Sequence, residues 1–244
     1  MPLSSVRRKA GGLEGRSRGW LLACVIGTAC MSPALAAEKE KPTAVGRRAE
    51  VRPFLRAGNP VAGRDKAEAE RCVECHGVEG HGSGEGVGGE GKFPKLAGQY
   101  PDYIIKQIRD FQSGARKHDI MTFMARSVAD GDLVDIAAYF GSQRRMSGEG
   151  QHRVQQTARL YQEGDAARGI PACVSCHVEQ RAATLAGAAG APIIAGQQWR
   201  YFDKQMRDWK SGDRTNSPDK VMNRIAAQLS EREIVELADY VSAQ

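Results

Sequence analysis

This 244-residue sequence has few of the features that would place it in a membrane or in a β-sheet. Its main apolar run, Trp20 to Cys30, is about 11 residues long, whereas a helix needs about 20 to cross a bilayer. No segment alternates apolar and polar residues as a half-buried strand does. Cysteine is also scarce, because the chain has six in all and two of them, Cys24 and Cys30, lie near its start. These absences favour a helical protein without a spanning segment and direct attention to the other four cysteines.

The first 36 residues predict an export signal. Five basic residues lie within positions 7–18, the apolar run follows, and Ala34-Leu35-Ala36 forms a cleavage site before Ala37. The stretch from Leu21 to Cys24 resembles a lipoprotein cleavage box, but too little apolar sequence precedes it. We therefore expect cleavage near Ala36 and a periplasmic mature protein with peripheral or no membrane attachment.

The formal net charge of +6 belongs to the beginning of the chain. Residues 1–36 carry a net charge of +4 and residues 37–60 carry +3, while residues 61–146 carry −1 and residues 147–244 are neutral. We expect residues 37–60 to form a basic flexible tail, because they lack an apolar pattern. Since the remainder is close to neutral, the sequence gives no support for nucleic-acid binding.

The remaining four cysteines lie in one motif that occurs twice. Cys72-Val73-Glu74-Cys75-His76 and Cys173-Val174-Ser175-Cys176-His177 both have the spacing Cys-x-x-Cys-His, which is typical of a covalently attached c-type haem. Two residues between the thiols let one helical turn present both sulfurs to the vinyl groups, and the adjacent histidine reaches the iron. We therefore predict two covalently bound haem c groups. Cys72, Cys75, Cys173 and Cys176 would hold them, with His76 and His177 as iron ligands.

Other uses of a Cys-x-x-Cys pair explain this motif less well. A structural zinc site would need both pairs in one tetrahedron, and a thioredoxin-like redox pair or a simple disulfide has no use for the adjacent histidine. The full five-residue pattern, found twice, favours haem.

The two motifs belong to an internal repeat of about 100 residues. They are 101 residues apart, and the segment Pro94 to Gln99 matches Pro192 to Gln197 at an offset of 98. The stretch from Tyr103 to Arg116 matches the stretch from Tyr201 to Arg214 at the same offset. The three extra residues of the first half fall in the Gly-rich loop His81 to Gly91. We therefore predict two tandem domains of one fold, at residues 61–146 and 147–244, joined near residues 141–151.

Each domain is predicted to be all-α. One helix should lead into each haem motif, over residues 64–75 and over residues 155–176 with an interruption near Pro171. A second helix should follow the Pro-x-Leu/Ile-Ala-Gly-Gln turn. A third should have apolar residues at helical spacing, preceded by acidic and capping residues. Those apolar positions are Leu133, Ile136, Ala137 and Phe140 in the first half and Ile234, Leu237, Ala238 and Val241 in the second.

Methionine is the expected second iron ligand, because a thioether favours reduced iron and raises the potential. Met121 and Met222 correspond to each other, and each lies 45 residues after its own haem histidine. Met124 and Met206 align with isoleucines and are interpreted as core residues. The free histidines, His81, His118 and His152, have no counterparts in the other half, and His118 is the alternative ligand that lies nearest to Met121 in sequence.

The paired haem motifs, the Pro-x-Leu/Ile-Ala-Gly-Gln segments, Tyr103 and Tyr201, the Ser-Gly pairs and the Met-x-x-Met/Ile-Ala runs resemble dihaem class I cytochromes c of the cytochrome c4 type. The resemblance covers residues 61–244. It implies two tandem class I cytochrome c domains, each wrapped round one covalent haem, with haem propionates near their interface. It also implies that the carbonyls of Pro94 and Pro192 orient the iron-ligating histidines. Val178 departs from the pattern, since Gly77 follows the first motif.

An iron closed by histidine and methionine leaves no position for oxygen, peroxide or nitrite, which favours electron transfer over catalysis. The leading hypothesis is a periplasmic carrier between a quinol-oxidising complex and a terminal oxidase or reductase, bound through small interfaces. The alternative is an electron-accepting subunit of a periplasmic dehydrogenase, such as flavocytochrome c sulfide dehydrogenase. A dihaem peroxidase is disfavoured because it needs one open iron.

Overall fold

The computed structural model describes residues 58–82, 93–148, 155–177 and 190–244. Within these ranges the helices are joined by turns and loops, and the β-structure is limited to one isolated bridge between Asp165 and Ile170. The all-α prediction is therefore confirmed. The predicted signal, nearly all of the basic tail, most of the Gly-rich loop, the end of the predicted linker and His152 and Val178 lie outside the described residues.

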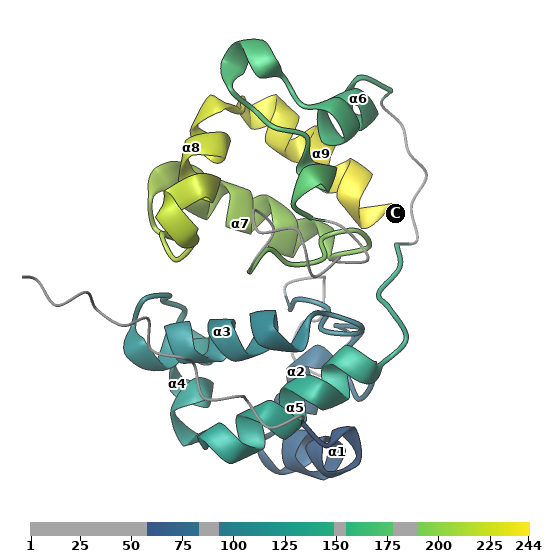
Figure 1. Cartoon of the computed structure of the whole chain (residues 1–244), viewed down its shortest axis with the longest axis vertical. Coiled ribbons are helices and arrows are strands. Elements are labelled where there is room, and N and C mark those ends of the chain that lie inside the picture. The colour runs from purple at the N-terminus through teal and green to yellow at the C-terminus, as the bar shows by residue number, and fades with distance from the viewer. Residues whose placement is uncertain (1–57, 83–92, 149–154, 178–189) are drawn as a thin grey trace, which may run out of the picture. The chain divides into compact units, whose positions relative to one another are not determined.

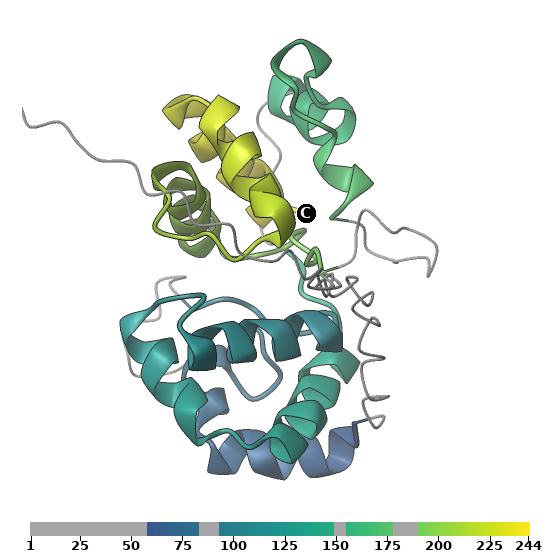
Figure 2. The ribbon, with the colours of Figure 1, turned by 60° about the vertical axis from the view of Figure 1, so that its left-hand side comes forward.

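In the first half, α1 and α3 both pack against α5, and Figures 1 and 2 both show the dark blue α1 alongside the teal α5. The apolar residues at helical spacing in α5 are all buried: Leu133 and Ala137 are fully buried, Ile136 is 4 % exposed and Phe140 is 1 % exposed. They pack with Ile104 and other residues of the same core. The helices of this half are α1 (Pro60–Ala69), α2 (Cys72–His76), α3 (Pro101–Ser113), α4 (Asp119–Met124) and α5 (Asp130–Ser142).

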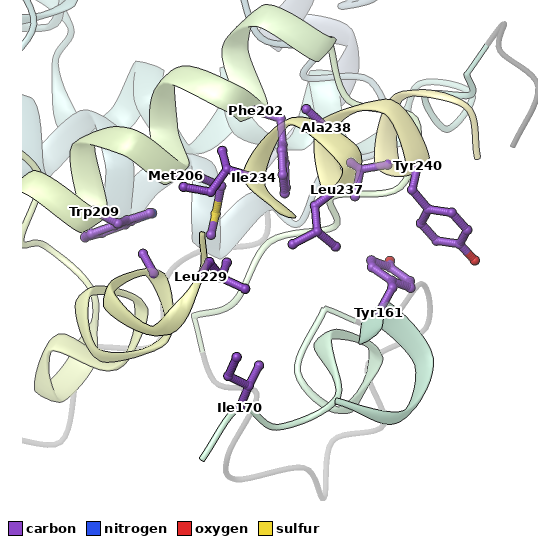
Figure 3. Close-up of a cluster of buried hydrophobic side chains, with 12 residues drawn as sticks. Tyr161, Ile170, Phe202, Met206, Trp209, Leu229, Ile234, Leu237, Ala238 and Tyr240 are labelled. Atoms are coloured by element: carbon purple, nitrogen blue, oxygen red, sulfur yellow. The ribbon is translucent and has the colours of Figure 1, made fainter. Parts of the chain in front are cut away.

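The second half repeats the pair of long helices, because α7 packs against α9 as α3 packs against α5. Ile234, Leu237, Ala238 and Val241 of α9 are buried as predicted, and Figure 3 shows three of them against Phe202 and Met206 of α7. The α-helices of this half are α6 (Gln155–Glu163), α7 (Trp199–Ser211), α8 (Val221–Gln228) and α9 (Glu231–Ser242).

The starts of the two last helices differ. At α9 the Ser230 side chain accepts from the Glu233 amide, and the Glu233 side chain reaches back to the Ser230 amide. This capping box satisfies two backbone donors that the helix leaves free. At α5 the N-cap position is Ala129, without a side-chain cap, and Asp130 lies in the first turn.

Neither helix that leads into a haem motif is continuous, which corrects both predicted ranges. In the first half α1 ends at Ala69 and α2 begins at Cys72, because Arg71 has a left-handed backbone (φ 60°). In the second half α6 ends at Glu163, Gly164 has φ 76°, and the second motif is reached through 3-10 turns at Ala166–Arg168 and Cys173–Ser175. A left-handed residue cannot continue a right-handed helix, so both motifs begin on separate short turns.

Close approach of backbones fixes α1 on α5. A Cβ atom at Gly63 would lie 2.0 Å from the carbonyl oxygen of Asp135, so only glycine fits there. The Asp135 side chain is buried (3 % exposed) and accepts from Lys66 Nζ at 2.5 Å. A buried carboxylate needs a charged partner. This ion pair therefore holds α1 against α5, the last helix of the first half.

None of the described helices is long and apolar enough to span a membrane.

Candidate functional site

Both haem-motif histidines are held in the same way by a proline carbonyl. Nδ1 of His76 donates to the Pro94 oxygen at 2.9 Å, and Nδ1 of His177 donates to the Pro192 oxygen at 2.8 Å. Burial lowers the pKa of both imidazoles and outweighs the carbonyl contacts, which raise it. A neutral ring that donates from Nδ1 leaves the Nε2 lone pair for a metal.

The four cysteines of the two motifs are each partly buried. Desolvation raises the pKa of Cys72 to about 11 and that of Cys173 to about 11. A reactive redox cysteine needs a lowered pKa, so the environment is the opposite of that of a thioredoxin-like pair. Across the described ranges, no cluster of three or more His, Cys, Asp or Glu side chains could hold a metal ion.

The second haem motif opens onto a cavity of about 580 Å³. Its lining includes Cys173, Cys176, His177 and Met222, together with the apolar side chains of the second core. Two thiols, an imidazole and a thioether around an apolar cavity are the groups that attach and ligate a class I haem. The donor set and the size of this cavity therefore fit haem c.

The two predicted methionine ligands lie in the first turns of short helices. Met121 lies in α4, which follows α3, and Met222 lies in α8, which follows α7. The Met121 amide donates to Nδ1 of His118 at 3.3 Å, and the Met222 amide donates to the Ser217 hydroxyl at 3.2 Å. His118 is thus the N-cap of α4, where it holds the first turn that carries Met121. The sequence predicted neither α4 nor α8 as a helix.

The other candidate ligands lie as follows. Met206 is 5 % exposed within the second core, as interpreted from its alignment, and Met124 is partly buried in α4. The His81 side chain is 34 % exposed and lies 3.8 Å from Glu79. His152 lies in a stretch for which the structure gives no placement.

Sequence reasoning missed two buried arginines that connect the repeats. Arg116 and Arg214 are each 8 % exposed, and each guanidinium group also stacks on an aromatic ring of its own half, Phe111 and Trp209 respectively. Arg116 donates to Gln107 at 2.8 Å and across to Tyr201 at 3.0 Å and Gln205 at 2.6 Å. Arg214 donates to Gln205 at 2.7 Å and across to Tyr103 at 3.3 Å and Gln107 at 3.1 Å.

This network has cationic donors but neutral acceptors. The two guanidinium groups lower the pKa of Tyr201, although burial by itself would raise it. Arg214 also lines the cavity of the second half. Buried guanidinium groups favour carboxylate partners, so the network fits the acidic edge of a haem. The signal for it was available in the sequence, because Tyr, Gln and Arg recur at an offset of 98.

Two glutamines also cross between the repeats and were matched in sequence without a role. Gln99 is 3 % exposed and Gln197 is 6 % exposed. Gln99 makes two hydrogen bonds to the backbone of Ile193, and Gln197 makes two to the backbone of Lys95. Each glutamine therefore contacts the residue that follows the histidine-binding proline of the other half.

Comparison with known proteins agrees with this geometry. The cytochrome c family profile matches residues 61–143. Cytochrome c4 of Pseudomonas aeruginosa is 38% identical over 76% of this chain and 88% of its own. The reduced cytochrome c4 of Pseudomonas stutzeri has a solved structure with a TM-score of 0.67 and 35% identity, which covers 77% of this chain and 99% of its own. A thiosulfate dehydrogenase electron acceptor from Thiomonas intermedia is 31% identical over 72% of this chain and 80% of its own.

The fold and the repeated Cys-x-x-Cys-His sites define a class I cytochrome c with two covalently bound haem c groups, and hence a dihaem electron-transfer protein. Within that class, the chain belongs to the cytochrome c4 family.

Proposed function

We propose that Cys72 and Cys75, and likewise Cys173 and Cys176, form the thioether links to the two haems. His76 and His177 would then be the first iron ligands, and Met121 and Met222 the second. Haem supplies one-electron redox chemistry when bound. The residues of the chain fix each imidazole through Pro94 or Pro192 and hold each methionine at the first turn of a short helix.

The observation that carries this proposal is the matched geometry of the two histidines. Both are oriented by a proline carbonyl, at 2.9 Å and 2.8 Å, and both have a methionine at the corresponding place in their own half. If both irons are closed by protein side chains, neither has a position for a substrate. Iron that keeps its ligands in both oxidation states needs little rearrangement, which suits rapid electron transfer.

We infer a periplasmic carrier that accepts electrons from a quinol-oxidising complex and passes them to a terminal oxidase or reductase. The predicted signal at residues 1–36 supports export, and residues 61–146 and 147–244 would be its two domains. Because both domains are close to neutral, docking should depend only moderately on salt, and the basic tail at residues 37–60 is the place where a stronger dependence could arise.

Stopped-flow oxidation of the reduced holoprotein tests this proposal. A purified terminal oxidase should oxidise both haems rapidly, whereas dissolved oxygen or peroxide alone should oxidise them slowly. Removal of residues 37–56 serves as the control for the tail and should leave the oxidation rate and its salt dependence little changed. Rapid turnover of peroxide or nitrite by the undamaged protein would contradict the proposal, because it requires an open iron.

A second candidate is supported by the relative named as a thiosulfate dehydrogenase electron acceptor. In that case the protein would be the electron-accepting subunit of a periplasmic dehydrogenase, which is the class of our alternative hypothesis, with thiosulfate rather than sulfide as the oxidised substrate. Size exclusion of the native protein separates the candidates. A free carrier elutes alone, whereas a subunit co-elutes with a stoichiometric catalytic chain and is reduced when thiosulfate is added.

A further inference from the structure

The two crossing glutamines act on the peptide units that hold the haem histidines. The carbonyl of Pro94 and the amide N–H of Lys95 belong to one peptide unit, because the two residues are consecutive. The carbonyl accepts from His76 at 2.9 Å, and the amide donates to Oε1 of Gln197 at 2.7 Å. This gives one hydrogen-bonded chain from an imidazole of the first half to a side chain of the second.

The second half has the reciprocal chain. The Pro192 carbonyl accepts from His177 at 2.8 Å, and the Ile193 amide of the same peptide unit donates to Oε1 of Gln99 at 2.9 Å. Each glutamine also donates to the carbonyl of the residue it holds, from Gln99 to Ile193 at 2.9 Å and from Gln197 to Lys95 at 3.0 Å. The oxygen and the nitrogen of each side-chain amide therefore both contact the opposite proline loop. Each oxygen also accepts from the next backbone amide of its own half, Tyr100 or Gln198, at 3.0 Å, and Nε2 of Gln197 also donates to Sδ of Met146 at 3.6 Å.

Each glutamine is anchored to its own half. The amide of Gly98 donates to Phe140 of α5, and the amide of Gly196 donates to Val241 of α9, both at the residue before the glutamine. The glutamine side chains are nine-tenths buried or more. A buried side chain fixed at its base on the last helix of one half therefore holds a loop of the other half.

A peptide whose N–H is engaged has a more strongly polarised carbonyl, because hydrogen bonds in a chain strengthen one another. A better acceptor at Pro94 or Pro192 makes the histidine a stronger electron donor to iron, which favours the oxidised state. We propose that Gln99 and Gln197 are positioning residues that tune, crosswise, the haem of the opposite half. This inference rests on the proposed iron ligation by His76 and His177.

Gln197 gives the decisive test, because its side chain lines the cavity of its own half. A purely local effect of Gln197→Leu would therefore change the haem of the second half. Crosswise tuning instead predicts that the potential of the first-half haem rises. It also predicts that the chemical shifts of the hyperfine-shifted ring protons of His76 change and that those of His177 do not.

The experiment uses the full-length holoprotein, with the two haems assigned by NMR through their attached cysteines. Gln99→Leu should raise the potential of the second-half haem. Gln143→Leu is the matched control and should leave that potential unchanged, because the Gln143 amide group donates within the first half, to Tyr139 and Ser142. Exchange of the Lys95 amide should accelerate about fivefold in Gln197→Leu, as expected for the loss of one hydrogen bond of about 1 kcal/mol. Gln197→Glu keeps the acceptor oxygen and should keep that amide protected.

Two outcomes would overturn the proposal. One is a potential change in Gln197→Leu that is confined to the second-half haem. The other is faster exchange of Lys95 with no change at His76. If Gln197→Leu does not assemble, the same reading is taken from Gln99→Leu, where a change confined to the first-half haem would again contradict crosswise tuning. Absence of hyperfine shifts on the His76 ring in the unsubstituted protein would instead contradict the ligand assignment, so the two failures are distinct.

Discussion

The two halves differ in the segment that leads from the first helix into the haem motif, which we call the approach. In the first half two residues separate α1 from the haem motif, whereas in the second half nine residues, 164–172, separate α6 from it. The longer path is closed by the bridge between Asp165 and Ile170. The proline loop, the second long helix and the last helix, by contrast, occur in both halves. The parts that touch the histidine and the core are repeated, and the approach to them has diverged.

Each half nevertheless ties its approach to the last helix with an ion pair. In the first half Lys66 of α1 pairs with Asp135 and Asp132 of α5. In the second half Arg168, in the longer path, pairs with Glu233 of α9, at the position that corresponds to Asp132. Both halves therefore have a charge anchor between the approach and the last helix, although the basic residue lies at a different place along the chain.

The largest expected effect tests whether the two halves bind haem equivalently. Replacing Cys72 and Cys75 by alanine, or Cys173 and Cys176 by alanine, should each remove about half of the haem that survives denaturation and acid extraction, because each pair forms the thioether links of one haem. The measurement is the haem-to-protein ratio. Full retention in either variant would show that the substituted pair does not attach haem.

The second prediction compares the distal ligands. Met121→Leu and Met222→Leu should each abolish about half of the weak near-infrared band that reports sulfur-to-iron ligation, and each should lower the potential of one haem only. Spectroelectrochemical titration measures both quantities. Met124→Leu and Met206→Leu are matched controls that should retain the band. Loss of the band in Met124→Leu rather than Met121→Leu would mean that the alignment of the two halves is wrong in this loop.

The third prediction concerns the packing of the first helix in each half. Gly63→Ala should destabilise the protein by about 2 kcal/mol, because the added methyl group forces α1 away from α5 and the gain in helix propensity offsets only part of that cost. Thr157, 3 % exposed in α6, makes a weak 3.3 Å contact with Glu236 of α9. Thr157→Ala should therefore cost less than about 1 kcal/mol.

Urea unfolding of the two holoprotein variants, followed by circular dichroism, measures the difference. Equal losses would show that α1 packs against α5 no more closely than α6 packs against α9, which would contradict the prediction.

Sequence patterns predicted the last helices well because their signals are local. The apolar spacing of Leu133 to Phe140 and of Ile234 to Val241 is that of a buried helical face, and all eight predicted positions are buried. The breaks before the haem motifs were less accessible. Gly164 after Glu163 was a turn signal that the prediction overlooked, but nothing local marks the left-handed backbone of Arg71.

The features of the site also divide into those with a signal in the local sequence and those without one. The spacing along one repeat predicted the haem motifs and the matched methionines, and the family resemblance pointed to the prolines, whose carbonyls accept from the two histidines. The arginine network and the crossing glutamines depend on contacts between residues about 100 positions apart, such as Gln99 with Ile193. Periodicity says nothing about such contacts. Only the recurrence of the same residue at both copies of a polar position pointed to them, and recurrence alone does not specify a partner.

The smallest effect tests the charge anchor of the second half. Arg168 donates to Glu233 at 2.7 Å, and this contact, helped by the Ser230 amide, lowers the pKa of Glu233 to about 2. Because the folded pKa lies below the ordinary value of 4.5, the pair stabilises the fold above about pH 4.5, and this stability is lost as the pH falls toward 2. The Arg168 side chain is 36 % exposed, so water screens the pair and we expect Glu233→Gln to cost about 1 kcal/mol at pH 7.

Urea unfolding midpoints at pH 7, 4 and 2.5, measured from NMR signals of second-half residues, test the sign of this effect. The difference between Glu233→Gln and the unsubstituted protein should shrink steadily as the pH falls, because protonation of Glu233 produces the same neutral group as the substitution. Glu163→Gln is the matched control, since the Arg159–Glu163 pair is exposed on both sides and should contribute nothing measurable at any of these pH values. A difference that stays constant from pH 7 to pH 2.5 would mean that Glu233 stabilises the fold through packing and not through its charge. The anchor shared by the two halves would then be a coincidence of position.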